Sequence, residues 1–186
     1  MGATRFLVWR GSDDWRAEGT HVEFDDGGLR ATGTQIGGDP LPYRVDYALD
    51  ATDGFRTRRF EVTAAADDGT RRLVLERSTD DEWRIDGETA TALAGAQDCD
   101  LGLSPLTNFM PLRRHRLHER DGGADFLMAW VEVPNLVVHA SAQRYEHVAP
   151  GVVRFIDRGL FDGFTADLEL DADGLVLRYP DLAERV

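Results

Sequence analysis

The sequence predicts an all-β protein with little helix, and three observations support that prediction. Apolar and polar residues alternate along several segments, most strictly over residues 43–50, where every odd-numbered position from Tyr43 to Leu49 is apolar. Such a period of two is typical of a strand with one buried face. Acidic-glycine turn signals recur about every ten residues, a spacing found in sandwiches and barrels. No segment keeps a helical period for more than two or three turns.

The expected elements follow one another in order. In the first half we expect strands at residues 5–9, 19–24, 29–36, 43–50, 55–65, 71–77 and 82–85. Turn signals such as Asp26-Gly27-Gly28 separate them. In the second half we expect strands at residues 112–118, 126–133, 136–148, 152–158, 164–170 and 175–179. The composition of residues 89–97 is compatible with a helix, but their Thr and Gly content weakens the prediction of a helix there. The tail at 180–186 is compatible with one helical turn.

Residues 98–114 break this pattern, because they form the longest segment without a clean strand or helix period. Pro105 and Pro111 each remove a backbone donor and bias the preceding residue away from helix. Between them stand large apolar residues such as Leu106 and Phe109, which a simply solvated loop would leave exposed. We therefore expect a loop that joins two β halves, lies over the core and helps to shape the main concavity.

Length and composition predict one globular domain, residues 1–186. The chain is 42% hydrophobic and 30% charged, which leaves enough apolar material for a core. No apolar run approaches the roughly 18 residues that a membrane span needs, and the N-terminus has no signal-peptide layout. Cys99 is the single cysteine, so no internal disulfide can form. We expect a cytoplasmic protein without a membrane span.

The charge of the chain narrows the classes of partner. The formal net charge is −13, and such a surface repels phosphate backbones, so we do not expect nucleic acid as a partner. All 21 basic residues are arginine. The absence of lysine from the sequence excludes mechanisms that use a Schiff-base lysine or the lysine of a phosphate-binding P-loop.

Metal-binding and cofactor-binding patterns are weak. His115 and His118 stand three residues apart, which puts them on opposite faces of a strand, and no carboxylate or cysteine lies at a convincing zinc-ligand offset. The paired glycines of the sequence belong to turn signals, and no glycine-rich phosphate loop is recognisable. We therefore predict neither a metal site nor a cofactor.

Asp98 and Asp100 are the strongest catalytic candidates. On an extended segment they share one face, and two carboxylates can act as acid and base. They can equally cap turns or pair with Arg113 and Arg114. An enzyme that uses these four groups in a central cleft, as a hydrolase or isomerase of a small molecule, is therefore one alternative function.

Aromatic residues favour a binding function instead. The four tryptophans and four tyrosines are spread along the chain. Such side chains can line a cavity for an amphiphile, with rings against an apolar or sugar face and arginines against an anionic group. Gln143 and Tyr145 share one face of their expected strand. The competing interpretation is that most of these aromatic residues belong to the core.

Several motifs occur in the order found in a known family. They are residues 43–50 with Arg58 and Arg59, residues 81–87, residues 98–101 followed by 104–114, residues 143–145, and residues 164–180. The most specific is the core Asp-x-Asp-Leu…Pro-x-Thr-Asn-x-x-Pro-x-Arg-Arg at 98–114. With these motifs, which span nearly the whole chain, the sequence resembles the family described as putative glycolipid-binding, first defined as a domain of unknown function.

The resemblance implies an antiparallel spiral β-roll, a curved sheet rolled on itself, similar to the roll of bacterial lipoprotein and glycolipid carriers. It implies a non-catalytic protein that binds an amphiphilic small molecule such as a glycolipid, and it supplies no catalytic residues. Residues 105–111 would close one end of the roll, where Asn108 and Arg113 would face the ligand. The ligand-binding residues that we predict are Trp9, Arg59, Trp83, Asp98, Asp100, Asn108, Arg113, Gln143 and Tyr145. A structural or protein-interaction module is a third alternative, and a homodimer through edge strands stays open.

Overall fold

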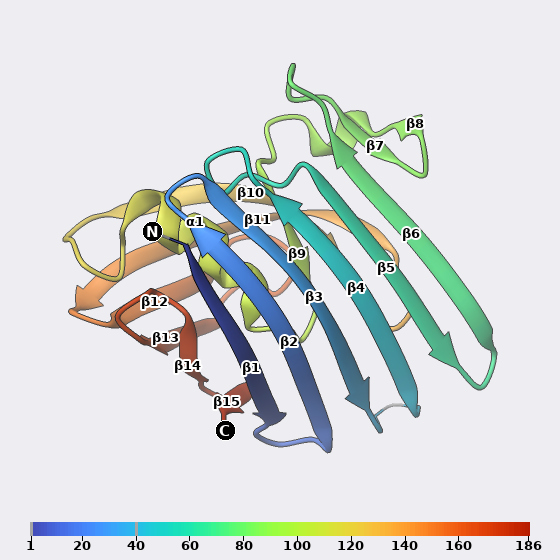
Figure 1. Cartoon of the computed structure of the whole chain (residues 1–186), viewed down its shortest axis with the longest axis horizontal. Helices are drawn as coiled ribbons and strands as arrows, with labels where there is room; N and C mark the ends of the chain where they lie inside the picture. The colour runs from blue at the N-terminus through green and yellow to red at the C-terminus, as the bar shows by residue number, and fades with distance from the viewer. Residues whose placement is uncertain (1, 40) are drawn as a thin grey trace.

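The computed structural model describes residues 2–39 and 41–186. Within these residues fifteen strands form one curved sheet (Figure 1). The strands are β1 (Ala3–Gly11), β2 (Arg16–Asp25), β3 (Gly28–Gly37), β4 (Tyr43–Ala51), β5 (Arg59–Ala66), β6 (Gly69–Arg77), β7 (Trp83–Ile85), β8 (Glu88–Thr89), β9 (Asp98–Leu101), β10 (Gly123–Val131), β11 (Val138–Ala149), β12 (Val152–Asp157), β13 (Thr165–Leu170), β14 (Val176–Tyr179) and β15 (Ala183–Arg185). The helical elements are η1 (Thr91–Leu93), η2 (Leu106–Asn108) and α1 (Phe109–His115).

The order of strands makes the sheet a roll that is not closed. It runs from β8 back to β1, continues through β15 and β14, and ends at β10 and β9. The first and last strands of the chain join the two halves, with Trp9 opposite Arg185 and Gly11 opposite Ala183. Neighbouring strands are antiparallel, except that β9 lies parallel to β10. The predicted all-β roll with little helix is therefore confirmed, with one parallel strand at its end.

The strand alternation places the expected residues inside. Along β4 the side chains of Tyr43, Val45, Tyr47 and Leu49 are buried, and the intervening ones lie toward solvent. Two clusters form the core: one lies mainly under the first half of the sheet and the other under the second half. This arrangement follows from the period of two, which gives each strand one apolar face.

The central segment differs from the expected loop. Residues 98–101 form β9, and residues 106–115 form η2 and then α1. Pro111 fits there because it lies in the first turn of α1, where backbone N–H groups have no intrahelical partner. The expected strand at 112–118 is therefore wrong. Its first part is the end of α1, and Arg116 ends the helix in the left-handed conformation.

Two further boundaries differ from the sequence prediction. The strand expected from residue 55 begins only at Arg59, because Phe55 adopts a positive φ and turns the chain before it. The tail does not form a helical turn. Instead, residues 183–185 form β15, which fills the place between β1 and β14.

Helix α1 lies inside the roll, between the strands of the two halves (Figure 1). Phe109 and Met110 belong to the first core cluster, and Leu112 belongs to the second. All three side chains are fully buried. The segment from β9 to α1, residues 98–115, therefore fills much of the interior. We call it the interior segment. In the described part of the chain, no helical element has the length and apolar character needed to cross a bilayer.

Candidate functional site

A cavity of about 280 Å³ lies beside the interior segment, against the inner face of β10, β11 and β12. The loop between β12 and β13 and the end of β14 complete its wall. We call it the aromatic cavity. Its lining residues are Asp100, Leu101, Leu103, Ser104, Asn108, Trp130, Ser141, Gln143, Phe155, Asp157, Phe161, Phe164, Tyr179 and Leu182.

Five aromatic side chains of the lining form two contacting groups, which together we call the aromatic wall. The ring of Phe155 lies 6.0 Å from that of Phe164 and 6.0 Å from that of Tyr179, between ring centres. Phe164 and Tyr179 are stacked at 6.4 Å. Trp130 and Phe161 meet edge to face at 5.6 Å. These rings come from three strands and one loop, so only the roll brings them together.

Polar side chains of the lining belong to a hydrogen-bond network. The Asp100 carboxylate accepts a hydrogen bond from Thr107 Oγ1 at Oδ1 and one from Gln143 Nε2 at Oδ2, each at 2.7 Å. The buried Tyr145 hydroxyl donates to Asn108 Oδ1 at 2.7 Å and lies 3.2 Å from Gln143 Oε1. This network joins β9, η2 and β11, and it holds the polar groups at fixed positions before any ligand arrives.

The pKa of the Asp100 carboxyl is raised to about 6. Burial is the largest cause, the hydrogen bonds from Gln143 and Thr107 act against it, and the charges of Asp157 and Asp98 act in the same direction as burial. A carboxyl with such a pKa, at the wall of a cavity, is typical of a functional site.

Asp157 is the second carboxylate of the cavity and is 3% exposed. Its Oδ1 accepts hydrogen bonds from the backbone N–H groups of Gly159 and Phe161, both at 2.8 Å. These bonds fix the start of the loop that carries Phe161 and Phe164 into the aromatic wall. Across the sheet Asp157 stands opposite Gln143, which bonds Asp100. The two carboxylates therefore face the same space.

The structure brings together part of the predicted set of ligand-binding residues. Asp100, Asn108 and Gln143 line the aromatic cavity. The Tyr145 hydroxyl contacts the side-chain oxygens of Asn108 and Gln143.

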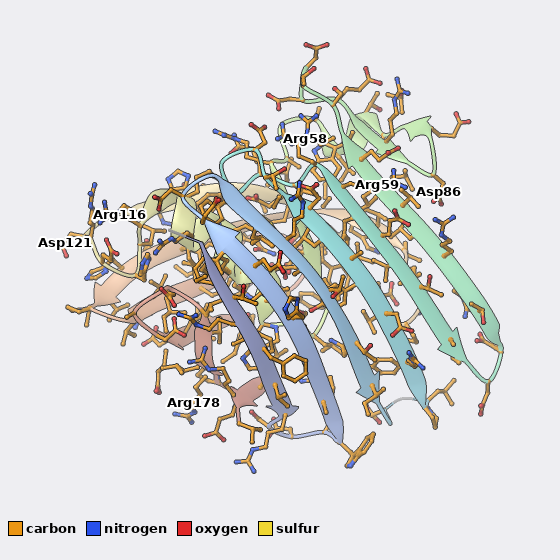
Figure 2. All side chains as sticks on the ribbon, in the orientation of Figure 1. Arg58, Arg59, Asp86, Arg116, Asp121 and Arg178 are labelled. Atoms are coloured by element: carbon orange, nitrogen blue, oxygen red, sulfur yellow. The ribbon has the colours of Figure 1, made fainter. Side chains whose placement is uncertain are left out.

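The other predicted residues lie elsewhere. Trp9 and Trp83 are each 1% exposed in the packed core, where their indole N–H groups donate to the carbonyls of Val176 and Ala96. Arg59 lies on the outer side of β5, where it pairs with Glu61 and Glu76 (Figure 2).

The four groups considered for catalysis do not converge. Asp98 is fully buried and paired with Arg114 through two hydrogen bonds. Arg113 Nη1 donates to the backbone carbonyl of Asp173 at 3.2 Å and does not line the cavity. Of the four, Asp100 is the one that lines it. Among the described residues, no group of His, Cys, Asp and Glu side chains is placed to hold a metal ion.

The sequence interpretation missed the aromatic wall and Asp157. Phe155 and Asp157 share a parity on β12, as Ser141 and Gln143 do on β11, so alternation could have grouped each pair on an inner face. Phe161 carries no such signal, because it stands in an aperiodic loop.

A second hollow, of about 370 Å³, lies on the outer face of β2 to β5. Charged side chains line much of it, and two pairs form among them, Arg59 with Glu61 at 2.7 Å and Arg30 with Asp50 at 3.6 Å. Figure 2 shows that charged side chains project from this outer surface. Because this hollow is open and polar, the aromatic cavity is the stronger candidate for a ligand site.

The fold and the cavity together define a class of protein: an open β-roll with an interior helix and an aromatic-lined cavity beside it. Residues 6–185 match the family model described as "Putative glycolipid-binding", and the chain belongs to this family. A solved crystal structure of a DUF1089 family protein from Pseudomonas aeruginosa shares the fold. Its TM-score is 0.78 at 26% sequence identity, over 96% of this chain and 95% of that chain. No curated protein matches the sequence.

Proposed function

We propose that the protein binds an amphiphilic small molecule, such as a glycolipid, in the aromatic cavity and does not transform it. The observation that carries this proposal is that the cavity is lined both by five aromatic rings and by hydrogen-bonded polar side chains. Aromatic rings stack on the apolar face of a sugar or contact methylene groups, while carboxylate and amide oxygens accept hydrogen bonds from hydroxyl groups. The description of the family supports the same ligand class.

The size of the cavity limits which part of the ligand it encloses. Ligand pockets commonly span roughly 300–1,000 Å³, and the volume of this cavity, about 280 Å³, lies just below that range. A headgroup with its first methylene groups suits this space better than a complete lipid with two chains. The side chain of Phe161 is 56% exposed at the rim of the cavity, where it would contact the emerging chain.

The dispersed candidates for catalysis support a binding function over an enzyme. Asp98 is already occupied by Arg114, and Arg113 lies outside the cavity. Asp100 has a pKa raised to about 6, whereas the second carboxylate of the cavity, Asp157, accepts the backbone N–H groups of Gly159 and Phe161 and holds the loop that carries Phe161.

Calorimetric titration with n-octyl β-D-glucoside, kept below its micelle concentration, tests the proposal. We expect one bound molecule per chain, and at least tenfold weaker binding after the double substitution of Trp130 and Phe161 by Ala. Trp15→Ala, at a side chain 72% exposed and outside the lining, is the control and should bind as the parent does. Absence of binding by this and other octyl amphiphiles would overturn the proposal. Release of glucose, followed by NMR, would favour the enzyme instead.

A further inference from the structure

The two carboxylates of the aromatic cavity lack a positive partner. Three aspartates stand near the interior segment, and Asp98 has the guanidinium of Arg114 at 2.6 Å. Within the described residues, Asp100 and Asp157 form no ion pair, and no Arg or His lines the cavity. Carboxylates withdrawn from water are costly unless a cation compensates them. The cavity therefore presents uncompensated negative character that a ligand can neutralise.

Acceptor atoms in the cavity also lack partners. Asp157 Oδ1 is satisfied by two backbone N–H groups, whereas Oδ2 receives no hydrogen bond from any described residue. Tyr179 is 7% exposed and lines the same cavity, and its hydroxyl has no hydrogen-bond partner among the described residues. Burial raises the pKa of Tyr179, and the charges of Asp100 and Asp157 act in the same direction. The three side chains line the same cavity and can accept hydrogen bonds from a ligand.

The aromatic wall suits the same kind of ligand. Trp130, Phe161 and Tyr179 contribute rings to the cavity. A positive nitrogen is attracted to the face of an aromatic ring, and aromatic cages bind quaternary ammonium groups in this way. A carboxylate beside the rings adds a charge attraction to the same nitrogen. An anion would meet these rings and two carboxylates without a single cationic side chain.

We propose that the polar end of the ligand is an ammonium group, held between the two carboxylates and the aromatic wall, and that the cavity rejects anionic headgroups. This inference rests on the proposed function, because it uses the same cavity, and it names the ligand class more closely. An amphiphile with an amino-sugar headgroup or with an alkylammonium headgroup would satisfy it.

Four probes with the same octyl chain separate the alternatives: octylammonium, octyltrimethylammonium, octyl β-D-glucoside and octyl sulfate. Titrated at neutral pH and moderate salt, octylammonium should bind about tenfold more tightly than the glucoside, and the sulfate should bind more weakly than the glucoside. Tighter binding of octylammonium than of octyltrimethylammonium would show that N–H donation to the free acceptors contributes. Equal binding of these two would assign the preference to charge alone. Either result supports the ammonium site.

Asp157→Asn is the variant that isolates the charge. The Asn side-chain oxygen can still accept from the N–H groups of Gly159 and Phe161, so the loop should keep its position. Preference for octylammonium over the glucoside should fall about tenfold, because the amide removes the charge that attracts the ammonium group but still offers an oxygen acceptor to a hydroxyl group. Asp162→Asn removes an exposed carboxylate from the same loop and should change neither affinity. Circular dichroism of each variant verifies the fold.

The outcomes distinguish the two proposals. Binding of the glucoside without any preference for octylammonium overturns the ammonium site and leaves the proposed function standing. Absence of binding by every probe overturns both. A preference for octylammonium that survives Asp157→Asn means that the charge of Asp157 does not hold the ammonium group, and this result also overturns the site between the two carboxylates.

Discussion

Arg114 and Asp98 meet inside the roll through two parallel hydrogen bonds. Nη1 donates to Oδ1 at 2.8 Å, and Nη2 donates to Oδ2 at 2.6 Å. Nη1 also donates to the backbone carbonyl of Phe55 at 2.8 Å. Asp98 is fully buried, and the Arg114 side chain is 9% exposed. The pair therefore ties the end of α1 to β9 and to the turn before β5, and it holds the interior segment beside the cavity.

Removing the positive partner should destabilise the protein strongly. Arg114→Met leaves Asp98 as a buried carboxylate without compensation, which costs about 3–5 kcal/mol of unfolding free energy. Urea denaturation measures this change. Arg5→Ala breaks an exposed pair with Asp173, at 3.0 Å, and should cost less than about 1 kcal/mol. The double variant with Asp98→Asn should regain much of the loss. A cost below that of Arg5→Ala would contradict the structural role of the pair.

Asp100 should make stability depend on pH. Its pKa is about 6 in the folded protein against 3.8 ordinarily, so the folded state holds the proton more tightly than the unfolded chain. Its contribution to stability therefore falls as pH rises from about 4 to about 6, by an amount on the order of 3 kcal/mol at most. Asp100→Asn should remove this fall. Measured by urea denaturation, the variant should gain stability relative to the parent as pH increases.

The control for this titration is Asp125→Asn, because Asp125 is an exposed carboxylate on β10, away from the cavity lining. Its stability profile between about pH 4 and pH 7 should run parallel to that of the parent. In Asp100→Asn the side-chain oxygen keeps one of the two hydrogen bonds that the carboxylate accepts. Loss of the other bond makes the gain in stability of the variant smaller, but the gain still increases with pH. A stability difference that stays constant with pH would show that Asp100 does not titrate in this range.

The strand prediction succeeded where one face of a strand is buried and failed inside the roll. Along β4 the alternation from Tyr43 to Leu49 directly reports burial on one face. Helix α1 has seven residues and contains Pro111, so it is too short for a helical period to emerge. A helix of this length is held by burial of Phe109 and Leu112, which is a tertiary effect that local sequence cannot reveal.

The candidate site was predictable only where motif and strand parity coincided. Asp100, Asn108 and Gln143 stood in the motifs of the family, and the structure places all three at the cavity. Trp130 and Phe161 are far apart in sequence and lie in contact only because the roll folds β10 against the loop after β12. A period of two identifies which face of a strand is buried, but it does not say which distant strands share that interior.

Gly33 should be required for the packing of Tyr47. A Cβ atom at position 33 would overlap the Tyr47 ring, whose hydroxyl donates to Glu18 Oε1 at 2.6 Å. Gly33→Ala should therefore cost about 2 kcal/mol of unfolding free energy through overpacking. Gly19→Ala is the matched control on the neighbouring strand, because its Cβ would meet only Phe6 at 3.7 Å, an ordinary contact. If both variants unfold at the same urea concentration, the close approach at Gly33 is not structurally important.

Trp130 should report the entry of a ligand by fluorescence. It is half-buried at the aromatic cavity, whereas Trp9 and Trp83 are sealed in the core and Trp15 is 72% exposed and outside the lining. Titration with n-octyl β-D-glucoside should change the emission of the parent, because the ligand replaces water against the indole ring. Trp130→Phe should lose this change, and Trp15→Phe should keep it. The reverse pattern, with the signal lost only in Trp15→Phe, would place the ligand on the outer surface and not in the cavity.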